Sequence, residues 1–144
     1  MEKIDRRAIL AALAAAPSIG MTRPARAQAA NTLKIGVLTD MSGPFRDISG
    51  PTSGAATRTA VQDFGVAARG WNVEVIIADH QNRPDVGVTL ARQWIDRDGV
   101  DVIVDVPNSG VALAVNSVVR ERNKVYLNST AATADLTGAQ CSPN

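Results

Sequence analysis

The sequence predicts an α/β fold built on a parallel sheet, and two observations support this prediction. Four short runs of β-branched and aliphatic residues, each of strand length, are separated by stretches in which apolar residues recur every three or four positions. The links between these segments are short. Alternating strand and helix patterns are typical of βαβ units, in which successive strands run parallel. The 144 residues, 45% of them hydrophobic, suffice for the core of one domain.

The predicted strands are mostly apolar and cover residues 33–38, 73–78, 100–106 and 124–128. We expect most of them to be buried on both faces of the sheet. The predicted helices lie between them, with apolar stripes formed by Ala56, Ala60 and Phe64, by Leu90, Ala91, Trp94 and Ile95, and by Val111, Val115 and Val118. Pro84 stands at the start of the second helix, and Gly65 and Gly99 follow the first two as stop signals. Because Trp94 lies within its stripe, we expect it to fill the core.

Residues 1–27 have the composition of a secretory signal peptide. Basic residues precede an apolar run at residues 8–21, and an Ala-x-Ala site at residues 25–27 follows it. The run is shorter than the roughly 20 residues that cross a bilayer as a helix. We therefore expect export and cleavage after Ala27, which leaves residues 28–144 as one domain. The Arg6-Arg7 pair leaves both the general secretory and the twin-arginine routes open.

Charge and cysteine content restrict the function classes. The first 27 residues hold five of the 15 basic and two of the 14 acidic residues, which leaves 10 and 12 and a net charge of −2. Scattered basic residues and an aromatic content of 3% argue against a nucleic-acid partner. The lone Cys141 is expected to be a free thiol, to form an intermolecular bridge or to pair with a cysteine outside this sequence.

Most catalytic and cofactor motifs are absent. No strand is followed by Gly-x-Gly-x-x-Gly, no nucleotide P-loop occurs, and His80 is the only histidine. We therefore expect no cofactor, no metal site and no enzyme activity. One alternative is an exported α/β hydrolase built from Ser129, His80 and Asp79, although no Gly-x-Ser-x-Gly elbow is present. The simpler expectation is that His80 forms hydrogen bonds within its own loop.

The loops after the strands are the expected binding region, because ligands of open parallel sheets bind where the carboxyl ends of strands meet helix N-termini. Asn108 and Ser109 precede a helix, where they suit either carboxylate binding or simple helix capping. Residues 129–133 offer hydroxyls and small side chains, or form an ordinary Ser/Thr-rich turn. Phe45 and Arg46 either contact the ligand or are ordinary loop residues. The predicted ligand-binding residues are Ser42, Phe45, Arg46, Asn108, Ser109, Ala131, Ala132 and Thr133.

Three segments resemble the branched-chain amino-acid type of periplasmic binding proteins. They are residues 33–44, with Leu-Lys-Ile-Gly-Val-Leu and Met-Ser-Gly-Pro, residues 79–84, with Asp-His-Gln-Asn-Arg-Pro, and residues 128–137, with Asn-Ser-Thr-Ala-Ala-Thr-Ala-Asp-Leu-Thr. Their order and spacing are similar to those of the family. The resemblance covers essentially all of the chain from residue 32 onward.

This resemblance implies the N-terminal lobe of a type I periplasmic binding protein, in which two α/β lobes close on a ligand. In the family, the ligand's carboxylate meets groups after the third strand, which here are Asn108 and Ser109. Its ammonium or other polar end meets the region of Ala131 and Thr133. The implied function is the solute-binding component of an ABC importer for amino acids or related aromatic or aliphatic carboxylates. Its implied location is the periplasm, and its implied partner is a membrane permease.

The family's members are more than twice as long as this chain. We therefore expect residues 28–144 to be an incomplete N-terminal lobe, with half of the cleft belonging to a second lobe. A single open lobe leaves a ligand largely solvated, so we expect weak or no binding by this chain alone. The ligand-sensing ectodomain of a receptor stays open as an alternative function.

Overall fold

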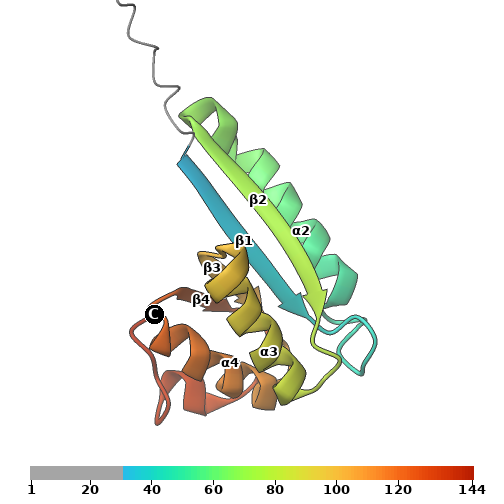
Figure 1. The fold of residues 1–144 in the computed structure, drawn as a ribbon. Coiled ribbons are helices and arrows are strands. Elements are labelled where there is room, and N and C mark those ends of the chain that lie inside the picture. The colour runs from blue at the N-terminus through green and yellow to red at the C-terminus, as the bar shows by residue number, and fades with distance from the viewer. Residues whose placement is uncertain (1–30) are drawn as a thin grey trace, which may run out of the picture.

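The sheet in the computed structural model, which describes residues 31–144, is formed by four parallel strands (Figure 1). In sheet order they are β2 (Trp71–Asp79), β1 (Asn31–Thr39), β3 (Val102–Asp105) and β4 (Val125–Asn128). The parallel α/β fold predicted from the sequence is thus confirmed, although β1 is longer and β3 shorter than expected. The predicted signal peptide at residues 1–27 lies outside the described residues.

The strands differ in length but end together. β1 and β2 pair over nine residues, up to Thr39 opposite Asp79, whereas the β1–β3 and β3–β4 ladders each hold four pairs. Asp105 lies opposite Leu38 on one side and Asn128 on the other. The four carboxyl ends therefore lie side by side at one edge, and the long β1–β2 ladder extends beyond the other strands at the opposite edge (Figure 1).

Helices cover both faces of the sheet. α2 (Gly50–Phe64) connects β1 to β2, whereas α3 (Pro84–Gln93) and α4 (Ser109–Glu121) pack against each other on the opposite face. Short helical segments follow at η1 (Val66–Arg69), η2 (Trp94–Asp98) and η3 (Ala134–Thr137). The chain leaves β1 toward β2 in one direction and continues through β3 and β4 in the other. The switch point between β1 and β3 is where sheets of this type bind ligands.

The main core lies between the sheet and the α3–α4 pair. Leu38 and Ile103 point from the sheet into a cluster with Val111 and Val115 of α4. Trp94, 5% exposed, lies over the position where Gly36 has no side chain, because a Cβ there would come within 2.5 Å of the indole. Trp94 therefore fills the core as predicted. No helix within residues 31–144 is both long and apolar enough to cross a membrane.

The first helix is confirmed, but its predicted apolar stripe is not buried. Ala56, Ala60 and Phe64 are exposed, and the buried residues of α2 are Gly50 and Gly54. The side chain of Ile77 fills the space over Gly54, where a Cβ would lie 2.4 Å from its Cδ1 atom. Spacing alone did not indicate this close contact, because it is made by glycine, which carries no apolar side chain.

One apolar strip of the sheet has no helix over it in the described residues. Val102 and Val104 of β3 and Val125 and Leu127 of β4 share the α2 side of the sheet, as the register shows. Val125 is 45% exposed and Leu127 is 58% exposed.

Cys141 is exposed and forms no disulfide within residues 31–144.

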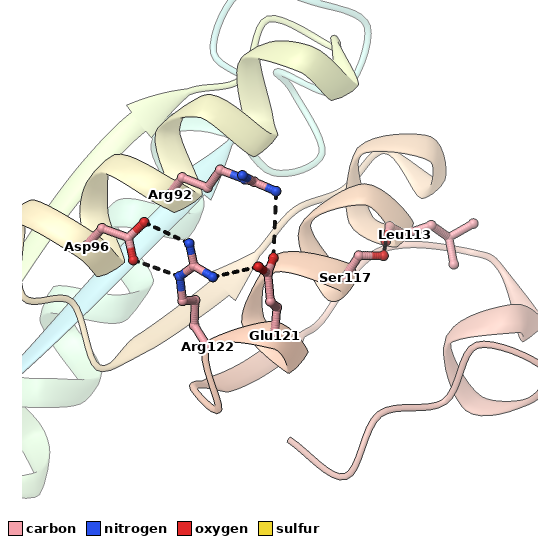
Figure 2. A network of polar contacts seen from close by, with 6 residues as sticks. All are labelled: Arg92, Asp96, Leu113, Ser117, Glu121 and Arg122. Carbon is pink, nitrogen blue, oxygen red and sulfur yellow. Dashed lines mark hydrogen bonds and ion pairs between the residues drawn. The ribbon is translucent and has the colours of Figure 1, made fainter.

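An ion-pair network ties the end of α4 to η2. Figure 2 shows Arg122 placing its guanidinium against Asp96, with Nε–Oδ1 and Nη2–Oδ2 distances of 2.8 and 3.2 Å. Its Nη1 atom also lies 2.7 Å from Glu121, which in turn faces Arg92 at 3.6 Å. These side chains are partly exposed, so the network fastens the two helices without being part of the core.

Candidate functional site

Polar residues gather at the carboxyl ends of the strands. Thr39, Asp40, His80 and Asp105 are all buried there. Buried polar groups require hydrogen-bond partners, and the loops at this edge supply them.

The first loop is folded around the carboxylate of Asp40. Its two oxygens accept hydrogen bonds from the backbone N–H groups of Gly43 and Phe45 at 2.8 and 3.0 Å. Phe45 is half-buried, whereas Ser42 and Arg46 are exposed. The three predicted binding residues of this loop are therefore held on a turn fixed by Asp40.

Asp79 and His80 join the second loop to the first. Asp79 accepts hydrogen bonds from the backbone of Met41 and Gln81 at 3.0 and 2.8 Å. Burial alone would raise the pKa of Asp79, but these bonds and one from the Ser42 hydroxyl lower it below its usual value. The aspartate is therefore ionised at neutral pH and holds both loops.

His80 is fully buried, and its imidazole has a defined tautomer. The Nδ1 atom accepts a hydrogen bond from the backbone N–H of Asn82 at 3.0 Å, so the proton of the neutral ring lies on Nε2. That Nε2 atom has no hydrogen-bond partner within residues 31–144. Burial lowers the pKa of His80, against the attraction of nearby carboxylates. The expected hydrogen bond within its own loop is confirmed. No hydrogen bond joins His80 to Ser129 in this part of the chain.

The N-terminus of α4 contains two of the predicted residues. The Asn108 side-chain oxygen caps the helix by accepting from Val111 N–H at 2.9 Å, and its amide donates to Asn82 Oδ1 at 2.6 Å. The capping interpretation of Asn108 is therefore confirmed. Ser109 is half-buried, and its hydroxyl forms no hydrogen bond within the described residues. Ser109 thus stands at a helix N-terminus with a free hydroxyl, where an anion is favoured.

The loop after β4 presents the remaining predicted residues. Ala131 N–H donates to the Asn128 side chain at 2.9 Å, so this amide already has a partner. Thr133 Oγ1 accepts from Asp135 N–H at 3.3 Å, which leaves its hydroxyl proton for another acceptor. Ala131 and Thr133 line a cavity of about 270 Å³, and Ala132 is exposed. None of the other predicted residues lines this cavity, so the eight residues surround one sheet edge without sharing one pocket.

Asp105, Ser49 and Thr39 are polar residues of this edge that the sequence analysis did not select. Asp105 accepts hydrogen bonds from the hydroxyls of Ser49, Ser129 and Thr130, and Ser49 also contacts Thr39. Burial alone would raise the pKa of Asp105, but hydrogen bonds from the hydroxyls of Ser49, Thr130, Thr39 and Ser53 lower it. The sequence offered one signal for this polar role, which is that the charged Asp105 lies within the predicted apolar strand at residues 100–106. It was overlooked because its partners are distant in sequence.

Comparison with known proteins identifies both a matching family and a related protein. Residues 32–144 match the family described as periplasmic binding protein. A Leu/Ile/Val-binding protein homologue from Brucella melitensis is 30% identical over 130 residues, which cover 90% of this chain and 34% of that protein.

Two solved structures extend the comparison. A periplasmic binding protein from Burkholderia mallei is 46% identical, with a TM-score of 0.75 over 79% of this chain and 30% of that one. A solute-binding protein of an ABC transporter from R. palustris, in complex with benzoate, is 26% identical, with a TM-score of 0.72 over 79% of this chain and 31% of that one. The chain thus spans about a third of the length of these relatives.

Proposed function

Because this chain belongs to the periplasmic binding protein family, we propose that it is part of the solute-binding component of an ABC importer. The proposed location is the periplasm, reached by means of the signal peptide at residues 1–27, and the proposed partner is a membrane permease. The names of the Brucella and R. palustris relatives support this proposal. In this role the chain binds and releases its ligand without changing it.

The proposed ligand is an amino acid or an aromatic or aliphatic carboxylate. One observation carries this choice: Ser109, whose hydroxyl has no hydrogen-bond partner within residues 31–144, stands at the N-terminus of α4, beside the switch point of the sheet. Backbone N–H groups and the helix dipole favour a carboxylate at such a position. Asn108 contributes by fixing the start of the helix, since both ends of its own amide are engaged.

The opposite end of the ligand is assigned to the loop after β4. Thr133 Oγ1 keeps a second lone pair that can accept from an ammonium, and its hydroxyl proton is left for another polar group. The small side chains of Ala131 and Ala132 let a ligand approach the backbone. Ser42, Phe45 and Arg46 lie on the first loop, whose half-buried Phe45 suits the apolar part of a ligand. In this arrangement the first loop contributes to selectivity, and the helix N-terminus provides the carboxylate contact.

Equilibrium dialysis at high protein concentration tests the proposal with leucine, benzoate and putrescine, a diamine without a carboxylate. We expect weak, millimolar retention of the two carboxylates and none of the diamine, because residues 31–144 supply one side of the proposed cleft. Ser109→Asp, which puts a negative charge at the helix N-terminus, should abolish retention, whereas Ser117→Asp on the exposed side of α4 should not. Equal retention of all three compounds would refute the carboxylate site, and micromolar binding by residues 28–144 would refute the incomplete cleft.

A further inference from the structure

Asp105 lies where three separate segments of the chain meet. Its carboxylate accepts one hydrogen bond from Ser49, the residue before α2, and two from the loop after β4. The latter come from Thr130 Oγ1 at 2.5 Å and Ser129 Oγ at 3.2 Å. Ser49 in turn contacts Thr39 Oγ1 at 2.6 Å, at the end of β1. A single side chain therefore connects β1, the start of α2 and the fourth loop.

The backbone at this point adopts an uncommon conformation. Asp105 and Val106 have φ angles of 78° and 62°, and a β-branched residue such as Val106 rarely adopts a positive φ. The side chain of Asn128 stabilises this turn by donating to the carbonyls of both residues, at 2.7 and 3.0 Å. The same Asn128 accepts the N–H of Ala131. The strained turn and the segment that carries Ala131 are thus held by the same groups.

The carboxylate of Asp105 is stabilised by hydroxyl donors rather than by a Lys or Arg side chain within residues 31–144. Asp105 takes part in none of the ion pairs formed by Lys and Arg within residues 31–144. A buried carboxylate without a cationic partner depends on every hydrogen bond it accepts. Ser49 holds one carboxylate oxygen, and Ser129 and Thr130 hold the other. Loss of a donor on one oxygen therefore lets the carboxylate rotate, which is expected to disturb the contacts at the other oxygen, even though they belong to a different loop.

We propose that Asp105 is a positioning residue that couples the first loop to the loop after β4, and so sets the geometry in which Ala131 and Thr133 face a ligand. This inference rests on the proposed function. Asp105 has no assigned contact with the ligand itself. It acts through Ser49 on one side and through Thr130 on the other.

Amide hydrogen exchange of the full 144-residue chain, without ligand, tests this coupling. Two N–H groups report on the loops, that of Ser49, which donates to Phe45 O, and that of Ala131. Thr130→Val should speed exchange at Ser49, and Ser49→Ala should speed it at Ala131, each roughly tenfold. Exchange at Val115 in the core of α4 should stay unchanged, which separates coupling from a general loss of stability.

Several variants sharpen the test. Thr130→Ser keeps the hydroxyl and should restore slow exchange. Thr137→Val removes a hydroxyl of η3 that, among the described residues, donates only to Ala134 O, and it should leave Ser49 unaffected. In an Asp105→Asn background, Thr130→Val should no longer change exchange at Ser49, and Ser49→Ala should no longer change exchange at Ala131. These changes at the distant loop are the cross-effects. If that variant does not fold, the pair Ser49→Ala and Thr130→Val still decides the question. Cross-effects below about twofold, or equal acceleration at Val115, would overturn the inference. Because no ligand is used, absence of the coupling would overturn this inference and leave the proposed function standing. Absence of carboxylate binding with intact coupling would instead overturn the proposed function and leave the coupling standing.

Discussion

The side-chain amide of Asn108 donates a hydrogen bond to the side-chain carbonyl of Asn82 at 2.6 Å, so the residue that caps α4 also holds the loop after β2. Two loops that are 26 residues apart in the sequence are thereby joined at the edge of the sheet. The helix N-terminus assigned to the ligand carboxylate is thus fixed by contacts outside its own helix.

Substitution of Asn108 separates its two contacts. Asn108→Ala removes both and should lower the free energy of unfolding by about 1–2 kcal/mol, because a helix cap and a polar contact are lost together. Asn108→Ser keeps a capping oxygen but is too short to reach Asn82, and should cost clearly less. Urea denaturation of the two variants measures the difference. Equal losses would show that the cap contributes nothing.

The pH dependence of stability should report His80. Burial lowers its pKa in the folded chain below the ordinary value of 6.5, so the unfolded chain binds a proton more readily. The free energy of unfolding should therefore decrease as the pH falls from about 7 to about 5, with a slope of up to about 1.4 kcal/mol per pH unit.

His80→Gln is the matched variant for this measurement, because glutamine does not titrate. It should flatten the slope between about pH 7 and 5. Asp79 and Asp105 have lowered pKa values, so their contributions are lost only as the pH falls through values below 3.8 and do not enter this window. A slope that persists in His80→Gln would assign the pH dependence to another group.

Replacement by alanine should cost very different amounts of stability at two aliphatic residues of the sheet. Ile103 is fully buried against α3 and α4, so Ile103→Ala should cost about 2–5 kcal/mol of stability. Leu127→Ala should cost less than about 1 kcal/mol, because Leu127 is 58% exposed on the uncovered strip. Thermal or urea unfolding distinguishes them. A large loss at Leu127 would mean that another part of the protein covers that strip.

The ion-pair network in Figure 2 should contribute little, and its contribution should depend on salt. Arg122→Gln breaks the contacts with Asp96 and Glu121 and should cost up to about 1 kcal/mol at low ionic strength. Most of that difference should disappear at about 1 M salt, where the Debye length is about 3 Å. Unfolding measurements at both salt concentrations test this, and a salt-independent loss would point to packing of the arginine stem instead.

Much of the fold followed from the sequence because hydrophobic periodicity and glycine and proline positions are local signals. The four strands, the three helices and the core position of Trp94 were predicted in this way. The sheet-facing side of α2 was not, because Gly54 marks it by the absence of a side chain. The turn of π-helix at η2 also had no recognisable sequence signal.

The candidate site was only partly predictable. Its loops follow from the rule on parallel strand ends, and the capping role of Asn108 follows from its place before a helix. The group of hydroxyl donors around Asp105 does not follow from such rules. Its donors, Ser49 and Thr130, lie 56 and 25 residues away, and only the fold brings them together. The ligand contacts stay predictions for all eight residues that were selected from the sequence.

A titration of the isotope-labelled chain with leucine or benzoate, followed residue by residue by NMR, tests the central claim most directly. The account predicts fast-exchange amide shifts at Ser109 and across residues 131–133, saturating at millimolar ligand, with none at the far end of the β1–β2 ladder near Trp71. Shifts centred on the far end, or no shift at Ser109 and Thr133 at about 20 mM ligand, would contradict it.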